Sequence, residues 1–147
     1  MIQLPPPVAA LLGYVAGVPT YSLMAELAVN RVVVGALPAV GAYPEALARA
    51  GDRRWRMHAE FSLAHARIRA ERGDVTGTAG QAAKTVIETA HAWACRHRQW
   101  VLNEKTLIER AGLRAAHDWF TRVPAAPAAL VEWVGGLGAL LAADARA

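Results

Sequence analysis

The spacing of apolar residues along the chain predicts helices. Between residues 53 and 98, apolar side chains recur at intervals of three and four, which brings them to one side of an α-helix. Outside such segments, apolar and polar residues never alternate over four positions, as they would in a half-buried strand. We therefore expect an all-α fold, an up-and-down helical bundle of about five to six helices.

Two long helices are expected in this bundle, the second of them at its centre. The longer helix is predicted over Arg53–Arg72, with Arg56–Glu60 and Arg67–Glu71 as ion pairs on its outer side. Its core-facing seam is predicted to be Met57, Phe61, Ala64 and Ile68. The next helix begins after Asp74, a suitable N-cap, and runs to about Arg98. Its apolar stripe comprises Ala79, Ala83, Val86, Ala90, Trp93 and His97, mostly small side chains that allow close helix packing.

Shorter helices precede this central pair. A helix is predicted over Thr20–Val34, capped by Thr20 and ended by Gly35, with an apolar face that includes Met24 and Leu27. A loop follows over residues 36–43. Pro44 then begins a helix that we expect to break near Gly51 and Asp52.

The C-terminal part is expected to hold three short helices. One begins at Asn103, and a second covers Leu113–Thr121 and packs through Leu113, Ala116 and Phe120. The last covers about residues 128–142 and packs through Leu130, Trp133, Val134, Leu137 and Leu141. At 147 residues the chain fits one helical domain over 1–147, with a short N-terminal segment 1–19, a core bundle 20–122 and a C-terminal helix 128–143.

Composition and charge restrict the binding partners and the cellular compartment that we expect for this protein. A formal net charge of +4 favours anionic partners such as nucleotide phosphates or RNA. The single cysteine, Cys95, excludes an intrachain disulfide and suits a reducing compartment, so we expect a cytoplasmic protein. The most apolar window, residues 128–143, contains Glu132 and is shorter than the roughly 20 residues that span a bilayer, so no membrane partner is expected.

The segment Gln99–Leu113 carries the main candidate site. Asn103 has the side chain of a helix N-cap, and Glu104 stands where the helix dipole favours a negative charge. Lys105 stands where the dipole disfavours a positive charge, so it is a candidate ligand-binding residue; the alternative is a solvated lysine.

Catalytic motifs of self-contained enzymes are missing from the sequence. It has no Asp-x-Asp pair, no glycine-rich phosphate loop and no nucleophile elbow around its two serines. Cys95 and His97 provide too few ligands for zinc, so no metal site is predicted. Arginines adjoin Trp55 and Trp100, a pattern that either binds single-stranded nucleic acid or anchors a bundle through its tryptophans.

Several stretches resemble the C-terminal helical domain of DNA-polymerase-β-type nucleotidyltransferases, the aminoglycoside-modifying kind and their relatives. The resemblance lies in Pro19–Tyr21 with Ala25–Ala28, in Phe61–Arg67 followed by Arg72–Val75, and in Leu102–Lys105. The resemblance implies a substrate-binding domain that closes the nucleotide and acceptor cleft of a catalytic domain not present in this chain. Lys105 would then contact a nucleotide phosphate, and Asn103 and Glu104 would position that segment or bind the acceptor.

These implications define the expected activity and partners. The chain would be inactive alone and would bind no cofactor by itself, whereas ATP or another nucleoside triphosphate with Mg²⁺ would bind once a catalytic domain joins it in cis or in trans. The alternative is a HEPN-like module that binds or cleaves RNA. Arg110 and His117, with six residues between them, match the Arg–His pattern of HEPN-type ribonucleases, in which such a pair acts on RNA phosphodiesters. A third hypothesis is an interaction bundle that forms a homodimer through its alanine- and glycine-rich faces.

Overall fold

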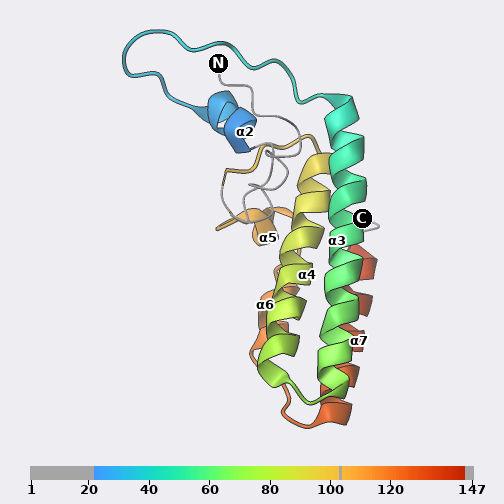
Figure 1. Ribbon diagram of the computed structural model, residues 1–147. Coiled ribbons are helices and arrows are strands. Elements are labelled where there is room, and N and C mark those ends of the chain that lie inside the picture. The colour runs from blue at the N-terminus through green and yellow to red at the C-terminus, as the bar shows by residue number, and fades with distance from the viewer. Residues whose placement is uncertain (1–21, 103, 145–147) are drawn as a thin grey trace. The chain divides into compact units, whose positions relative to one another are not determined.

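The computed structural model of the protein describes residues 22–102 and 104–144 (Figure 1). Every regular element in these ranges is an α-helix, which confirms the expected all-α bundle. The described residues fall into two compact units, residues 22–42 with 100–102, and residues 43–99 with 104–144. We call the second the bundle unit, and each unit is described by itself.

The first unit contains the short helix α2 (Ser22–Val29). The predicted extension of this helix to Val34 is wrong, because residues 30–42 contain no helix and the Val34 side chain is 92% exposed. Three consecutive valines at 32–34 explain the early end, since β-branched residues are poor helix formers. Thr20 and the segment 1–19 lie outside the described residues.

The bundle unit is built on an antiparallel pair of helices, α3 (Glu45–Glu71) and α4 (Val75–Arg96). The turn between them is a Schellman motif: Gly73 has a φ of 71° and donates to Ala70 O, and the next amide donates to Arg69 O. Asp74 caps α4 as predicted, and its side chain accepts a hydrogen bond of 2.8 Å from the amide of Gly77. This turn fixes the pairing of α3 with α4.

Three more helices complete the bundle unit: α5 (Leu107–Arg110), α6 (Ala115–Phe120) and α7 (Pro127–Asp144). Helix α7 begins beside the α3–α4 turn and returns along α3 (Figure 1). The predicted core residues of this helix are confirmed, since all are buried: Leu130, Trp133, Val134, Leu137 and Leu141. Trp119 of α6 and Trp133 of α7 each donate an indole hydrogen bond of 3.1 Å to the other's carbonyl oxygen.

Helix α3 is continuous where the sequence predicted a break. It runs through Gly51 and Asp52 without interruption. Gly51 lies against α4, and a Cβ atom built there would stand 2.6 Å from Cys95 Sγ. The glycine therefore permits close helix contact rather than ending the helix.

The predicted core seam of α3 is wrong, because these residues face outward. Met57, Phe61 and Ile68 are 59%, 63% and 43% exposed, and Ala64 is exposed as well. The opposite side of α3 is buried instead, and it consists of small residues: Ala48, Ala59, Ser62, Ala66 and Ala70. Small side chains let α4 approach closely, and this close packing selects the alanine face over the larger apolar face.

The predicted stripe of α4 is correct only in part. Val86 and Ala90 are buried, whereas Trp93 is half-buried and His97 is exposed. Two polar residues, Glu88 and His91, are buried in this helix although the apolar stripe did not include them. The buried face of α4 therefore differs from the predicted apolar stripe and includes the polar residues Glu88 and His91.

The predicted outer ion pairs of α3 are also wrong. Arg56 donates to Asp52 at 2.8 Å rather than to Glu60. Arg67 and Glu71 belong to no ion pair within the described residues. Exposed pairs of this kind contribute little, so small differences in rotamer decide which of them form.

Replacing Gly51 by alanine is expected to destabilise the protein, although alanine favours helix. The new methyl group would overlap Cys95 Sγ, and overpacking of this kind costs about 1–3 kcal/mol. The matched control is Gly80→Ala in α4, where a Cβ meets no atom within 4 Å and where alanine should stabilise by about 0.5–1 kcal/mol. Urea denaturation of the two variants measures the change in the free energy of unfolding that each substitution causes. Changes of the same sign in both variants would contradict this packing of Gly51 against Cys95.

The Asp74 cap is expected to make stability depend on pH. The hydrogen bond from Gly77 and, next, that from Arg69 hold the pKa of Asp74 below its ordinary value of 3.8. A lowered pKa stabilises the fold above pH 3.8, and this stabilisation is lost as the pH falls through the folded-state pKa. As the pH falls below 3.8, the melting temperature of the wild type should decrease more steeply than that of Asp74→Asn. The asparagine keeps a capping oxygen but cannot titrate. Equal pH dependence would contradict the expectation.

Candidate functional site

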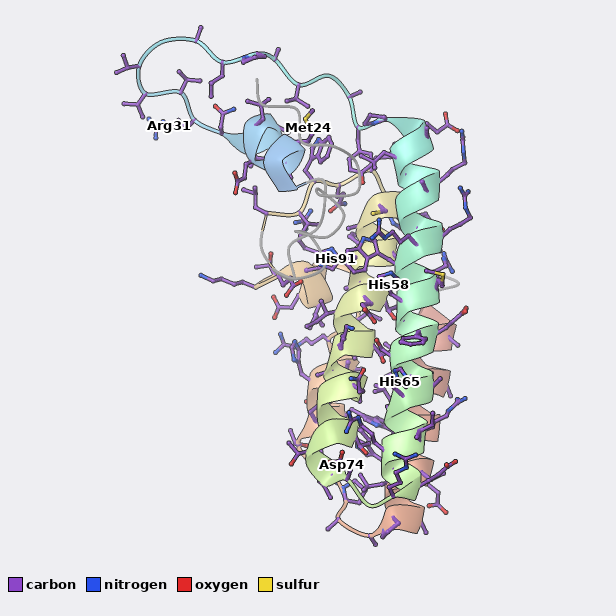
Figure 2. The ribbon with its side chains drawn as sticks, in the orientation of Figure 1. Met24, Arg31, His58, His65, Asp74 and His91 are labelled. Atoms are coloured by element: carbon purple, nitrogen blue, oxygen red, sulfur yellow. The ribbon has the colours of Figure 1, made fainter. Side chains whose placement is uncertain are left out.

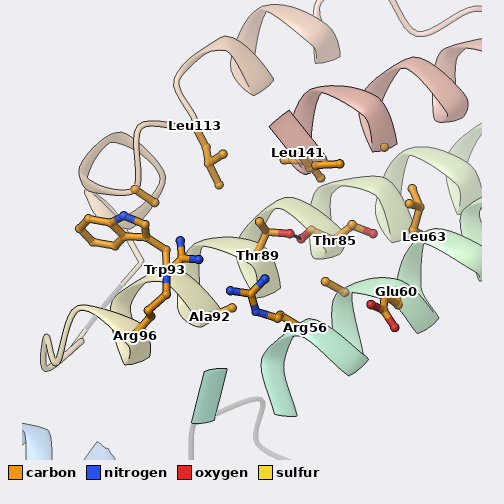
Figure 3. A pocket seen from close by; sticks show the side chains of 14 residues that line it. Arg56, Glu60, Leu63, Thr85, Thr89, Ala92, Trp93, Arg96, Leu113 and Leu141 are labelled. Carbon is orange, nitrogen blue, oxygen red and sulfur yellow. Dashed lines mark hydrogen bonds between the residues drawn. The ribbon is translucent and has the colours of Figure 1, made fainter. Parts of the chain in front are cut away.

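A cleft of about 340 Å³ lies within the bundle unit, between α3, α4, α7 and the segment 111–113 (Figure 3). This volume is at the lower end of the range for small-molecule sites. The helices present one face each to the cleft, with Arg56 and Leu63 from α3, Thr85 and Trp93 from α4, and Leu141 from α7. All of these lining residues belong to the bundle unit.

One end of the cleft is basic and aromatic. Figure 3 shows Arg56 from α3 and Arg96 from α4 extending toward one another beside Trp93. Arg56 is oriented through its Nε atom, which donates to Asp52 Oδ1 at 2.8 Å. Two guanidinium groups that converge can bind a phosphate or a carboxylate through several charge-assisted hydrogen bonds.

The rest of the cleft is lined by apolar side chains, two threonine hydroxyl groups and the carboxylate of Glu60. Leu63, Leu113 and Leu141 line it from three different segments. Thr85 and Thr89 donate their hydroxyl protons to backbone oxygens one turn earlier, at 2.9 and 2.8 Å, which leaves lone pairs on each Oγ to accept from a ligand. The cleft as a whole suits a ligand with an anionic group and a flat or apolar body.

A row of polar and aromatic side chains lies between α3 and α4, away from the cleft. The Trp55 ring stacks on the buried His91 ring with a centroid separation of 4.5 Å. Figure 2 shows His58 of α3 and His91 of α4 on these neighbouring helices. Near the end of the row, Tyr43 Oη donates to Cys95 Sγ at 3.6 Å, and burial, followed by this contact, raises the pKa of Tyr43 well above its ordinary value. Because its ring stacks on the buried His91, Trp55 packs within the bundle.

Glu88 is the most unusual member of this row. Its side chain is almost fully buried, and Oε1 lies 3.7 Å from Lys84 Nζ and 3.8 Å from His58 Nδ1. The Oε2 atom of Glu88 has no hydrogen-bond partner within the described residues, and neither has the Oγ atom of Ser62 on α3. Buried polar atoms without partners are costly, so this part of the interface is a weak point of the fold.

Of the predicted residues 103–105, the two described ones, Glu104 and Lys105, do not line the cleft. Glu104 Oε1 is 3.0 Å from Nε2 of the buried His91, a contact that joins this segment to α4. Lys105 is exposed, and Asn103 lies outside the described residues. None of the cleft's lining residues comes from this segment.

The predicted helix start at Asn103 is wrong. Helix α5 begins only at Leu107, with Thr106 as its N-cap, and residues 104–106 form a turn in which the Leu107 amide donates to Glu104 O at 3.2 Å. The dipole argument for Glu104 and Lys105 therefore does not apply. The contact with His91 fixes the position of Glu104 instead, and the sequence contains no signal for this pairing.

Arg110 and His117 make no direct contact with each other among the described residues. They lie on α5 and α6, and Arg110 donates to Gln99 Oε1 while His117 is exposed. No hydrogen bond, ion pair or ring contact joins the two side chains in the described part of the chain. The ribonuclease hypothesis stays a prediction from the sequence.

Comparison with known proteins gives no further assignment. No protein-family model, curated protein or solved structure matches this chain. Among the described residues, no helix has both the length and the apolar character needed to span a membrane. Within the same residues, no cluster of three or more histidine, cysteine, aspartate or glutamate side chains is arranged to bind a metal ion.

The contact between Glu104 and His91 is expected to hold the 104–106 turn on α4. Replacing Glu104 by alanine removes the acceptor for a buried ring nitrogen and should destabilise the protein by about 1–2 kcal/mol. Glu104→Gln keeps an acceptor oxygen and should cost much less, and Glu132→Ala on the exposed side of α7 serves as a control. Urea denaturation measures all three, and equal stability of the alanine and glutamine variants would contradict the role of the contact.

Proposed function

We propose that this chain is a helical accessory domain of a nucleotidyltransferase, and that it binds a nucleotide or a related phosphate-bearing ligand in the cleft between α3, α4 and α7. The convergence of Arg56 and Arg96 beside Trp93 carries the proposal, because it combines paired charges for a phosphate with an aromatic surface for a base. The net charge of +4 favours the same ligand class.

The nucleotidyltransferase part of the proposal rests on the sequence resemblance. In that assignment a catalytic domain, in cis or in trans, supplies the carboxylates that hold Mg²⁺, and this chain supplies helices that close over the nucleotide and the acceptor. Lys105, exposed on the 104–106 turn, is suited to contact a phosphate held by the catalytic domain. The contact between Glu104 and His91 supports this role because it anchors the turn that carries Lys105.

The cleft does not contain the groups of a phosphoryl-transfer centre by itself. Its one carboxylate is Glu60, and its hydroxyl groups on Thr85 and Thr89 donate to backbone oxygens rather than to a base. A nucleophile needs a base within hydrogen-bond reach, and neither threonine has one. The arrangement therefore supports binding and orientation.

The resemblance implied that ATP binds only once a catalytic domain is present, whereas the cleft leads us to expect that ATP binds the isolated chain through the two arginines. Replacing either Arg56 or Arg96 by alanine should weaken binding by about tenfold or more, because hydrogen bonds between charged groups contribute about 1.5–3 kcal/mol. Arg53→Ala is the matched control, since Arg53 is an exposed arginine of the same helix that does not line the cleft. Isothermal titration calorimetry measures the affinities.

Two outcomes would contradict the proposal. Unchanged affinity in both cleft variants, with loss in Lys105→Ala, would place the nucleotide on the 104–106 turn instead. Nucleotidyl transfer by the isolated chain with ATP and Mg²⁺ would overturn its assignment as an accessory domain.

A further inference from the structure

The outward face of α3 carries an apolar stripe that the other described residues of the bundle unit leave exposed. Met57, Phe61 and Ile68 are 59%, 63% and 43% exposed, and Ala64 lies between the last two. We call these four residues the α3 stripe. Three large apolar side chains in one line on a helix are uncommon on a monomer's surface and are typical of an interface.

The spacing of the α3 stripe is that of a coiled-coil seam. The positions of its members advance by four, three and four residues, so they occupy d, a, d and a positions across three consecutive heptads. The same register places Arg54 at the preceding a position and Glu71 at the following d position, and both are exposed. The seam is thus apolar at its centre, positive at one end and negative at the other.

The charges at the ends of the seam select the orientation of a partner helix. If a second copy of α3 packs in parallel, each a or d residue meets itself, so that Arg54 faces Arg54 and Glu71 faces Glu71. In an antiparallel pair each a position meets a d position, so that Arg54 faces Glu71 of the partner subunit. Like charges in contact are destabilising and opposite charges are not, so the antiparallel arrangement is favoured.

The apolar layers fit the same antiparallel register. Met57 would pack against Ile68 of the partner subunit, and Phe61 against Ala64 of the partner subunit. A large side chain opposite a small one fills space as the knobs and holes of a coiled coil do. A twofold axis relates the two copies in this arrangement, so each contact occurs twice, as in any isologous interface.

The flanking positions add a second pair of opposite charges. Glu60 and Arg67 occupy g positions beside the seam, and g positions meet each other in an antiparallel pair, which places Glu60 opposite Arg67 of the partner subunit. None of the four residues Arg54, Glu60, Arg67 and Glu71 forms an ion pair within the described residues. Other charged residues of α3, such as Arg49 and Arg56, do have intrachain partners.

We infer that α3 is the interface of an antiparallel homodimer, in which the α3 stripe of one copy packs against that of a second copy. The occupant is a second copy of this chain because the stripe is complementary to itself in charge and in size. This inference does not require the proposed ligand, since none of the four stripe residues lines the cleft.

The first test is the molecular mass of the full chain in solution. Sedimentation velocity over a range of concentrations should show a reversible monomer–dimer equilibrium. Phe61→Glu should weaken dimerisation by more than about tenfold, because it places a charge in the apolar centre of the interface. The exposed side chain makes this change compatible with folding, which the circular dichroism spectrum and the melting temperature verify. Val131→Glu, at a 38% exposed position on α7, is the matched control and should leave the dimer intact.

The second test concerns the orientation. Arg54→Glu and Glu71→Arg should each weaken the dimer, because each puts like charges opposite one another, and the double variant should restore it. A wild-type chain that stays monomeric at every concentration would overturn the inference, whether another part of the chain or a different protein covers the stripe. A dimer that survives Phe61→Glu, or a charge reversal without rescue in the double variant, would equally overturn it.

Discussion

The close contact between α3 and α4 is the constraint from which the other features of the bundle unit follow. Gly51 lies against Cys95, and the facing surfaces of the two helices are dominated by alanine. Helices that meet through small side chains approach closely and gain many dispersion contacts, but they leave no room for large side chains where the small residues face one another. Most large apolar groups therefore lie on the outer side of α3 or on α7, whereas Trp55 packs between the two helices against His91.

This constraint also explains the polar row between the two helices. Where the helices are close, a side chain such as Glu88 or His91 cannot reach solvent and must find partners inside. His91 has the Trp55 ring on one side and Glu104 at its nitrogen, so it is well accommodated. Glu88 is accommodated only through one oxygen, and its other oxygen remains without a partner among the described residues. Packing thus stabilises the interface between α3 and α4. Its polar groups make the part around His91 more stable than the part around Glu88.

The sequence was sufficient for the class of fold but ambiguous about which side of α3 is buried. Helix α3 has two faces with helical spacing, one of Ala59, Ala66 and Ala70 and one of Met57, Phe61 and Ile68, and hydrophobicity alone favours the larger side chains. Helix α7 has a single face of large residues, and there the core was predicted correctly. For the site, the arginines next to tryptophans were visible in the sequence, but the convergence of Arg56 with Arg96 depends on the pairing of α3 with α4. The same holds for Glu104 and His91, which are 13 residues apart and meet only after the chain has turned back at the end of α4.

Glu60 links the two proposals made for α3, because it lines the cleft and also flanks the α3 stripe. In the monomer its carboxylate lies at the edge of a cleft that the two arginines make attractive to an anion, and its charge opposes that attraction. In the antiparallel dimer Arg67 of the partner subunit would neutralise it, so the cleft would become more favourable for a phosphate. By thermodynamic linkage an anion in the cleft would then favour the dimer by the same factor. Because Glu60 is exposed, solvent would screen its charge and keep this coupling small, so dimerisation would adjust ligand affinity and would not be a condition for binding.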